Sequence, residues 1–399
     1  MNLKKQLRHL YAYSFASCLR LANAVWVVLL LGRGYSLWQV GLAEGIFHVV
    51  SLVAEIPSGM AADLMGRRRS LAVSGVLAML SGVVMAFSHN FALVCLSMAC
   101  SALSYNLISG TQEALAYDSL KQAGRSEEYL QIDANVGMLQ TFGDLISDCC
   151  SLLISVLSFT AFYLLDGAVG LLRVAAALGL SEPVVTARQA ERISHPFAGL
   201  GRRLRLHITQ TADFLRGNHR VARCIAANAL INLPCYLTQM YLQQRLSELG
   251  FPAMLLGLPL LALALGRWLG IIVGRRLHPR SLLRLYAACA LAGGLGTVLA
   301  GAAPAAPAVF GALVSAIAVD VWYLHVQKSL NDAYPSDQRA TLVSVDSMAY
   351  SVLMILASPV TGWIGDAAGT AGAGLCAVGA VLLLAAAGSA VCALVRKAR

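Results

Sequence analysis

Long apolar blocks separated by short polar gaps run along the whole 399-residue chain. Each block has about the ~20 residues that an α-helix needs to cross ~30 Å of hydrocarbon. Strand-length alternation of apolar and polar residues is absent. The pattern predicts an all-α polytopic membrane protein with twelve transmembrane helices. The predicted spans are 9–32, 38–62, 70–89, 91–117, 131–156, 158–180, 221–244, 251–274, 281–302, 306–328, 340–366 and 370–395.

The longest polar stretch lies at 181–220 and contains two prolines and a run rich in arginine. Six predicted spans precede it and six follow it. This layout is the one expected of transporters built from two similar halves. We therefore expect an N-terminal six-helix bundle at 1–180, a cytoplasmic basic linker at 181–220 and a C-terminal six-helix bundle at 221–399.

Composition supports the membrane assignment, because 58% of the residues are hydrophobic and only 13% are charged. A soluble protein carries about a quarter charged residues. The net charge of +10 could indicate a nucleic-acid partner, but the placement of the basic residues argues against one. Twenty-three of the 30 Lys and Arg fall in the gaps, or directly at their edge, on one side of the predicted membrane, and two fall on the other. This asymmetry predicts cytoplasmic termini and an integral protein of the cell (inner) membrane.

The ten cysteines are scattered, mostly inside predicted spans, without a CxxC motif or a Cys/His cluster. Neither a metal site nor a disulfide framework is implied. We expect no cofactor. No HExxH, GxSxG or paired metal-ligand motif points to an intramembrane enzyme, so we expect no enzymatic activity.

The most specific motif lies between the second and third spans, where the chain reads EIPSGMAADLMGRRRS at 55–70. It resembles the G-x-x-x-D-x-x-G-R-R-x signature of the major facilitator superfamily, and its glycines, aspartate and arginines fall on the family's positions. A small Gly59 would let helix backbones approach closely, and Gly66 would permit a tight turn. A breakable charge cluster here could bias one of two conformations and so act as a gate. Alternatively, the basic run only anchors topology. The predicted gating residues are Gly59, Asp63, Gly66, Arg67, Arg68, Asp118 and Arg339.

Two further stretches are similar to the same superfamily. The end of the fourth span reads GTQEALAYDSL at 110–120, which looks like a segment of bacterial drug or metabolite exporters, and DAYPSDQRAT at 332–341 resembles a second family stretch. The resemblance implies the fold of that superfamily. Two departures stand beside it. After the eighth span the motif recurs without its aspartate, and the fifth span lacks the Gly-Pro pair of drug antiporters.

Ionisable residues inside predicted spans are costly and are functional candidates by default. Asp144 and Asp148 are four residues apart and so share one helical face. Two such carboxylates in a low dielectric cannot both ionise easily, so one is suited to carry a proton. Alternatively, any of these charged residues forms a structural ion pair. The candidates for proton coupling are Glu113, Asp144, Asp148, Asp320 and His325.

The resemblance also implies that spans 1, 4, 7 and 10 line a central cavity. Mixed amide, aromatic and charged side chains on these spans suit an amphiphilic organic solute. The predicted cavity residues are Arg20, Asn23, Trp26, Tyr105, Asn106, Asn228, Asn232, Tyr236, Gln239 and Trp322.

The sequence therefore predicts a proton-coupled secondary transporter that works by alternating access and exports a small drug-like or metabolite solute. Proton-driven uptake of a nutrient is the alternative, and a membrane receptor that does not transport is a distant one. The expected partners are a small-molecule substrate, protons and the lipid bilayer, with no nucleic acid. The expected energy source is the proton gradient, and the expected assembly is a monomer.

Overall fold

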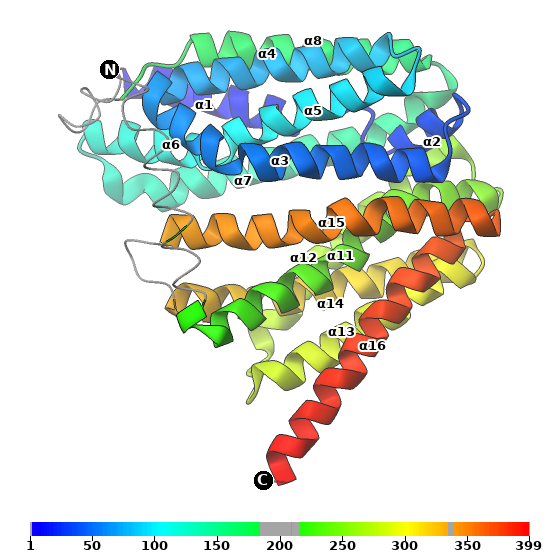
Figure 1. The fold of residues 1–399 in the computed structure, drawn as a ribbon. Coiled ribbons are helices and arrows are strands. Elements are labelled where there is room, and N and C mark those ends of the chain that lie inside the picture. Colours follow the sequence, from blue (N-terminus) through cyan, green and yellow to red (C-terminus); the bar gives the residue numbers. More distant parts are fainter. Residues whose placement is uncertain (1, 184–208, 210–215, 334–338, 399) are drawn as a thin grey trace. The chain divides into compact units, whose positions relative to one another are not determined.

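The computed structural model describes residues 2–183, 209, 216–333 and 339–398; the side chains of 63–64, 331, 339–343 and 391–398 lie outside this description. The described chain is almost entirely helical (Figure 1). Its contacts divide it into two compact units. Unit 1 comprises residues 1–24 and 46–206, and unit 2 comprises residues 25–45 and 207–399. The predicted boundaries at 180 and 220 remain predictions.

Unit 1 holds α1 (Leu3–Cys18), α4 (Arg67–Ala86), α5 (Phe91–Ile108), α6 (Thr111–Gln122), α7 (Tyr129–Cys149) and α8 (Phe159–Leu178), with the second part of α3 (Leu37–Met65). Helices α4 and α8 lie side by side (Figure 1). Glycines permit this close packing. A Cβ on Gly82 would lie 2.5 Å from the amide nitrogen of Gly167 and 2.7 Å from the carbonyl of Tyr163. Such small residues allow helix backbones to approach within a membrane.

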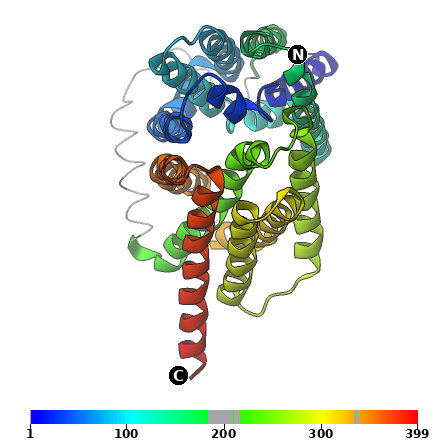
Figure 2. The ribbon, with the colours of Figure 1, turned by 90° about the vertical axis from the view of Figure 1, so that its right-hand side faces the viewer.

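Unit 2 holds α2 (Trp26–Leu31), the first part of α3, α11 (His219–Glu248), α12 (Gly257–Arg276), α13 (Leu282–Ala302), α14 (Ala305–Ala333), α15 (Arg339–Ala368) and α16 (Ala371–Ala398). Helices α13 and α16 pack along each other (Figure 2). Pro234 and Pro359 lie inside the continuous helices α11 and α15.

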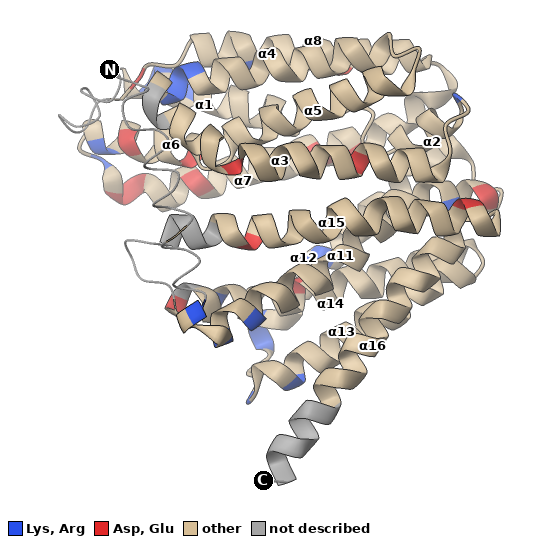
Figure 3. Cartoon of the chain, viewed as in Figure 1, with Lys and Arg blue, Asp and Glu red and all other residues tan. Residues whose placement is uncertain are grey.

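Ten helical segments within the described ranges are long and apolar enough to cross a membrane. The two other predicted spans, 9–32 and 131–156, correspond to α1 with α2 and to α7 with the 3₁₀ helix η2 (Cys150–Ser155). The all-helical membrane fold is confirmed, and twelve helices in two halves are consistent with it. Charged residues lie at helix ends and also within several helices such as α3 and α15, whereas α5 carries none (Figure 3).

The predicted first span, 9–32, is interrupted. Helix α1 ends at Cys18, residues 19–25 form an irregular turn, and α2 begins at Trp26. At the break, side chains of α7 and α8 bind backbone groups that a continuous helix would pair internally. The fourth span is interrupted as well, at Ser109–Gly110, where Gly110 takes a left-handed conformation with φ of 71°.

Candidate functional site

The predicted gating motif forms the corner between α3 and α4 in unit 1. Gly66 has φ of 89°, a left-handed value that disfavours any residue with a Cβ. Helix α4 starts at Arg67, directly after this turn. The Arg67 guanidinium forms an ion pair with Asp118 on α6 and donates a hydrogen bond to the carbonyl of Ala114 on the same helix. The corner is thereby fastened to the end of the fourth span.

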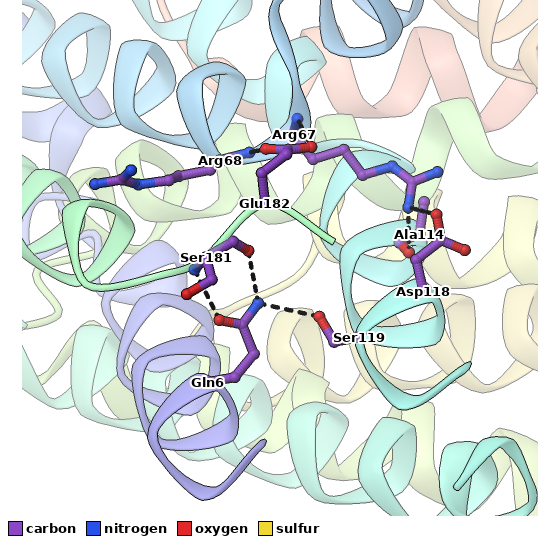
Figure 4. Close-up of polar contacts among 8 residues, drawn as sticks. All are labelled: Gln6, Arg67, Arg68, Ala114, Asp118, Ser119, Ser181 and Glu182. Carbon is purple, nitrogen blue, oxygen red and sulfur yellow. Dashed lines mark hydrogen bonds and ion pairs between the residues drawn. The ribbon is translucent and has the colours of Figure 1, made fainter. Parts of the chain in front are cut away.

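A carboxylate that sequence reasoning missed completes this corner. Glu182 accepts a hydrogen bond at 2.8 Å from the backbone amide of Arg67 and one at 2.7 Å from that of Arg68 (Figure 4). These are two of the amides that a helix N-terminus leaves without intrahelical partners, and an anion is favoured there by the helix dipole. The signal available in the sequence was an acidic residue just after the sixth span. Nothing in the sequence tied it to α4.

Arg68 and Gln6 form hydrogen bonds that connect the ends of further helices to the same corner. The Arg68 guanidinium donates at 2.8 Å to the carbonyl of Leu178, the last residue of α8. The Gln6 amide donates to the Ser119 hydroxyl and to the Ser181 carbonyl, both at 3.0 Å, and accepts from the Ser181 amide at 2.8 Å (Figure 4). This end of unit 1 is a polar network joining α1, α4, α6 and the segment after α8.

Three other gating predictions have different outcomes. The backbone of Asp63 lies in α3 and that of Arg339 in α15, but both side chains fall outside the described residues. No described atom lies within 4 Å of a Cβ built on Gly59. The described residues therefore do not supply the close approach that the sequence suggested for Gly59.

The cavity predictions on the first span lie at its break. Arg20 is exposed within the turn, Asn23 lies in the turn and is half-buried, and Trp26 is the first residue of α2. The Asp148 carboxylate on α7 interacts electrostatically with both Asp144 and Arg20. The structure thus brings two proton-coupling candidates and one cavity candidate into a single charged cluster. Asp148 is buried and Asp144 is exposed within its unit.

The three candidate residues of the fourth span, Glu113, Tyr105 and Asn106, differ in their exposure and in their contacts. Glu113 lies in the first turn of α6, just after the Gly110 break, where the helix dipole favours a carboxylate. Tyr105 is 58% exposed and its ring lies 6.0 Å from that of Phe47. Asn106 is buried, and its amide is paired with the Ser51 hydroxyl at 2.8 Å and the Ser51 carbonyl at 2.7 Å. Asn106 therefore joins α5 to α3, and the cavity role predicted for it is not supported.

The predicted cavity residues of α11 follow one face of that helix in unit 2. Asn228 donates to the Asp346 carboxylate of α15 at 2.8 and 3.1 Å, and Asn232 donates back to Asn228 at 3.0 Å. Tyr236 is 38% exposed and donates at 2.8 Å to Glu44, which is buried in α3. Gln239 is half-buried further along α11. The sequence alone could not predict that Asp346 pairs with Asn228 or Glu44 with Tyr236.

The candidates on α14 also differ from one another. Asp320 is buried and forms an ion pair at 3.0 Å with Arg267 of α12, whose side chain is exposed. One ring nitrogen of His325 lies 3.1 Å from the carbonyl of Gly274. Trp322 is only 2% exposed and packs edge-on against Tyr286 in the core of unit 2. Its prediction as a cavity residue is not supported, since the hydrophobic core covers the ring.

A bundle of membrane-length helices that carries paired and clustered charges within its spans defines a polytopic membrane transporter. The chain belongs to the Major Facilitator Superfamily, whose family model matches residues 11–324. It is a secondary transporter of the membrane, and its family consists of transporters rather than enzymes.

Comparisons with individual proteins agree with this assignment. The chain is 25% identical over 368 residues to the uncharacterized MFS-type transporter YxaM of Bacillus subtilis (strain 168), covering 90% of this chain and 89% of the relative. It is 30% identical over 147 residues to YdeG of the same organism, 36% of this chain and 33% of that one. The crystal structure of the nucleoside transporter NupG covers 100% of this chain and 99% of its own, with a TM-score of 0.75 and 16% identity. The D-xylose-proton symporter covers 97% and 95%, with a TM-score of 0.69 and 14% identity. These likenesses show the fold.

Proposed function

We propose that the chain is a proton-coupled transporter that works by alternating access and exports a small amphiphilic drug-like or metabolite solute. The observation that carries the proposal is the cluster of Asp144, Asp148 and Arg20 in unit 1. Two carboxylates on one helical face concentrate negative charge in a low dielectric beside the Arg20 guanidinium. A proton is the smallest group that can balance it.

Coupling follows if solute and proton compete for this charge. When the carboxylates hold a proton, their attraction for a cationic or hydrogen-bonding solute falls, so proton entry favours solute release. A ligand shifts a conformational equilibrium only as far as it binds the two states differently. Glu113 in unit 1 and Asp320 and His325 in unit 2 are further coupling candidates, and no cofactor is needed beyond the proton gradient.

The gate proposal is supported by the corner at Gly66. The ion pair of Arg67 with Asp118 and the cap of Glu182 on α4 fix this corner through charges. Such charged contacts can exchange partners during a conformational change, unlike a packed apolar contact. We assign Asp63 and Arg339 to the same gate on the sequence motif alone.

Export is favoured by the resemblance of the 110–120 segment to bacterial exporters. Proton-driven uptake is the second candidate, and Arg20 is the observation that favours it. An anionic solute could bind Arg20 together with a proton on Asp148, which would couple the two in the same direction. The name of one structural neighbour, a D-xylose-proton symporter, also fits uptake. We place the protein in the cell inner membrane as a monomer, with cytoplasmic termini.

Flux in proteoliposomes under an imposed pH gradient tests the coupling. Asp144→Asn and Glu113→Gln are compared with wild type and with Asp332→Asn, an exposed aspartate at the end of α14. We expect gradient-driven flux to fall about tenfold or more in the Asp144 variant, which is about 1.4 kcal/mol, and to stay at the wild-type level in the Asp332 variant. Proton coupling would be refuted if flux did not depend on the pH gradient and if Asp144→Asn and Glu113→Gln both transported at the wild-type rate.

The solute for that assay comes from a susceptibility profile. Cells with and without the protein are exposed to chemically varied cationic, neutral and anionic compounds. Resistance conferred by the protein indicates export, and growth on a limiting nutrient indicates uptake. A receptor that does not transport would show saturable binding but no flux.

A further inference from the structure

The interruption of the first span is held by charged and polar side chains from two other helices of unit 1. Asp166 of α8 accepts a hydrogen bond from the amide of Leu21 at 2.6 Å and one from that of Ala22 at 3.4 Å. Ser147 of α7 accepts from the amide of Arg20 at 2.9 Å. Three consecutive amides beyond the end of α1 are thus paired by side chains.

The carbonyl groups on the other side of the break are paired in the same way. Arg173 of α8 donates from Nε to the carbonyl of Ala16 at 3.0 Å and from Nη2 to that of Ser17 at 3.1 Å. The Ser147 hydroxyl lies 3.1 Å from the carbonyl of Cys18. A continuous helix would pair these carbonyls within itself, without any charged residue in the membrane.

The sequences of α7 and α8 place these side chains next to the break. Asp166 and Arg173 are seven residues apart, so they lie two turns apart on one face of α8. Gly143 lets α7 approach, because a Cβ there would lie 3.1 Å from the carbonyl of Phe15 and from the Cβ of Cys18. An acidic and a basic residue within a span are costly. Here both have backbone partners, and the result is an irregular segment that places Arg20.

Arg20 belongs to the same electrostatic neighbourhood as the groups that hold the break. It interacts with Asp148 of α7, with Asp166 and with Arg173. Irregular backbone at membrane depth is tolerated where it is buried in protein or lines a water-filled cavity. Because Arg20 is exposed in this segment, its position depends on the conformation of residues 19–25.

We propose that Asp166 and Arg173 are positioning residues for transport: they hold the first span open at residues 19–25 and so keep Arg20 beside Asp148. The proposal rests on the proposed function, in which the Asp144 and Asp148 pair carries the proton. Asp166 and Arg173 act through Arg20 and do not themselves touch solute.

Amide hydrogen exchange of the protein in nanodiscs tests the first half of the proposal without any solute. In Asp166→Asn, we expect the peptide that covers Leu21 and Ala22 to exchange at least about tenfold faster, since one acceptor and the charge are lost. Ser147→Ala is expected to accelerate exchange at Arg20 alone. Asp166→Glu, which keeps the charge, is expected to retain most of the protection, and Asp332→Asn all of it. Unchanged exchange in Asp166→Asn would overturn the proposal.

The second half is tested by the reaction of Asp148 with dicyclohexylcarbodiimide, which modifies protonated carboxyl groups. The charged groups that surround the reaction are Asp144 on the same helix, Arg20 at the break, and Asp166 and Arg173 behind it. Modification is measured by mass spectrometry against pH. We expect Arg20→Gln and Asp166→Asn each to move the midpoint by about one pH unit in the same sense.

The double variant separates positioning from simple destabilisation. If Asp166 acts through Arg20, combining the two substitutions moves the midpoint no further than Arg20→Gln alone. Additive shifts, an unmoved midpoint in Asp166→Asn, or no modification of Asp148 at any pH would overturn the positioning role. If the exchange and labelling results are as expected but the wild-type protein shows no gradient-driven flux, only the proposed function is refuted.

Discussion

At the scale of single residues, Arg67 shows how one side chain joins several helices. Its backbone amide opens α4 against the Glu182 carboxylate, and its guanidinium reaches α6 at Asp118 and Ala114. The ion pair is largely shielded, with side-chain exposures of 18% and 12%. Shielded pairs are expensive to break one partner at a time, because the remaining charge is left without its counterion.

Replacing Asp118 with asparagine is therefore expected to impair the proposed gate. We expect the initial rate of solute flux to fall about tenfold. Glu128→Gln is the matched control, because Glu128 forms an exposed ion pair with Arg125 within one helical turn, and such pairs contribute little. Equal rates for the two variants would show that the Arg67–Asp118 pair has no part in transport.

Replacing Glu182 with alanine removes the cap on α4. The expected loss is about 1 kcal/mol of stability, as for other helix N-terminal caps, and it is measured as a lower unfolding temperature in detergent. Glu182→Gln keeps an acceptor but loses the charge, so it should lie between alanine and wild type. A cap that worked through charge alone would leave Gln and Ala indistinguishable.

The roles of individual residues were harder to predict from the sequence than the positions of the spans. Hydropathy located Asn106 and Trp322 on the correct spans, but not the side of the helix each one faces. Asn106 instead pairs with Ser51, and Trp322 packs on Tyr286. Glu182 escaped prediction because its partners, the amides of Arg67 and Arg68, are 115 and 114 residues away in the chain.

At the scale of elements, the hydropathy pattern predicts where spans lie because their length is fixed by the bilayer. It cannot predict interruptions imposed from elsewhere. The first span reads as one apolar block, yet it is opened by Asp166, 145 residues from the amide it binds. The break of the fourth span is easier to predict from the sequence. Gly110 lies at the break, and glycine favours a left-handed turn.

The packing of α4 on α8 gives a prediction at this scale. Gly82→Ala places a methyl group against backbone atoms of α8, so we expect destabilisation of about 1–3 kcal/mol. Gly137→Ala in α7 is the control, because no described atom lies within 4 Å of its added Cβ. There the greater helix propensity of alanine should leave stability unchanged or slightly raised. The unfolding temperatures of both variants test this prediction. A Gly82→Ala variant as stable as wild type would contradict the packing argument.

At the scale of the whole molecule, the chain divides into two compact units, each with its own hydrophobic core. Leu10, Tyr13 and Leu71 lie in the core of unit 1, and Trp322 and Tyr286 in that of unit 2. Each unit therefore has a packed interior of its own, although the continuous helix α3 contributes to both units. The family and the fold were predictable from motif and span count; the transported solute was not, because selectivity depends on three-dimensional shape.

The charge asymmetry predicts the orientation of the molecule. A green fluorescent protein fused after residue 399 should fluoresce, and alkaline phosphatase fused after Arg33 should be active, because the positive-inside rule predicts a cytoplasmic position for the first and the opposite side for the second. Inactive phosphatase at Arg33 together with a dark fusion after residue 399 would reverse the topology.

The interruption at residues 19–25 also bears on how the protein is made. While the first span leaves the ribosome, its unpaired amides and Arg20 have no partners, because Ser147, Asp166 and Arg173 are not yet synthesised. The segment must therefore wait in the translocon or at the lipid headgroups, or form a provisional continuous helix, until α7 and α8 arrive. Helix α1 is then among the last helices of unit 1 to reach its final conformation.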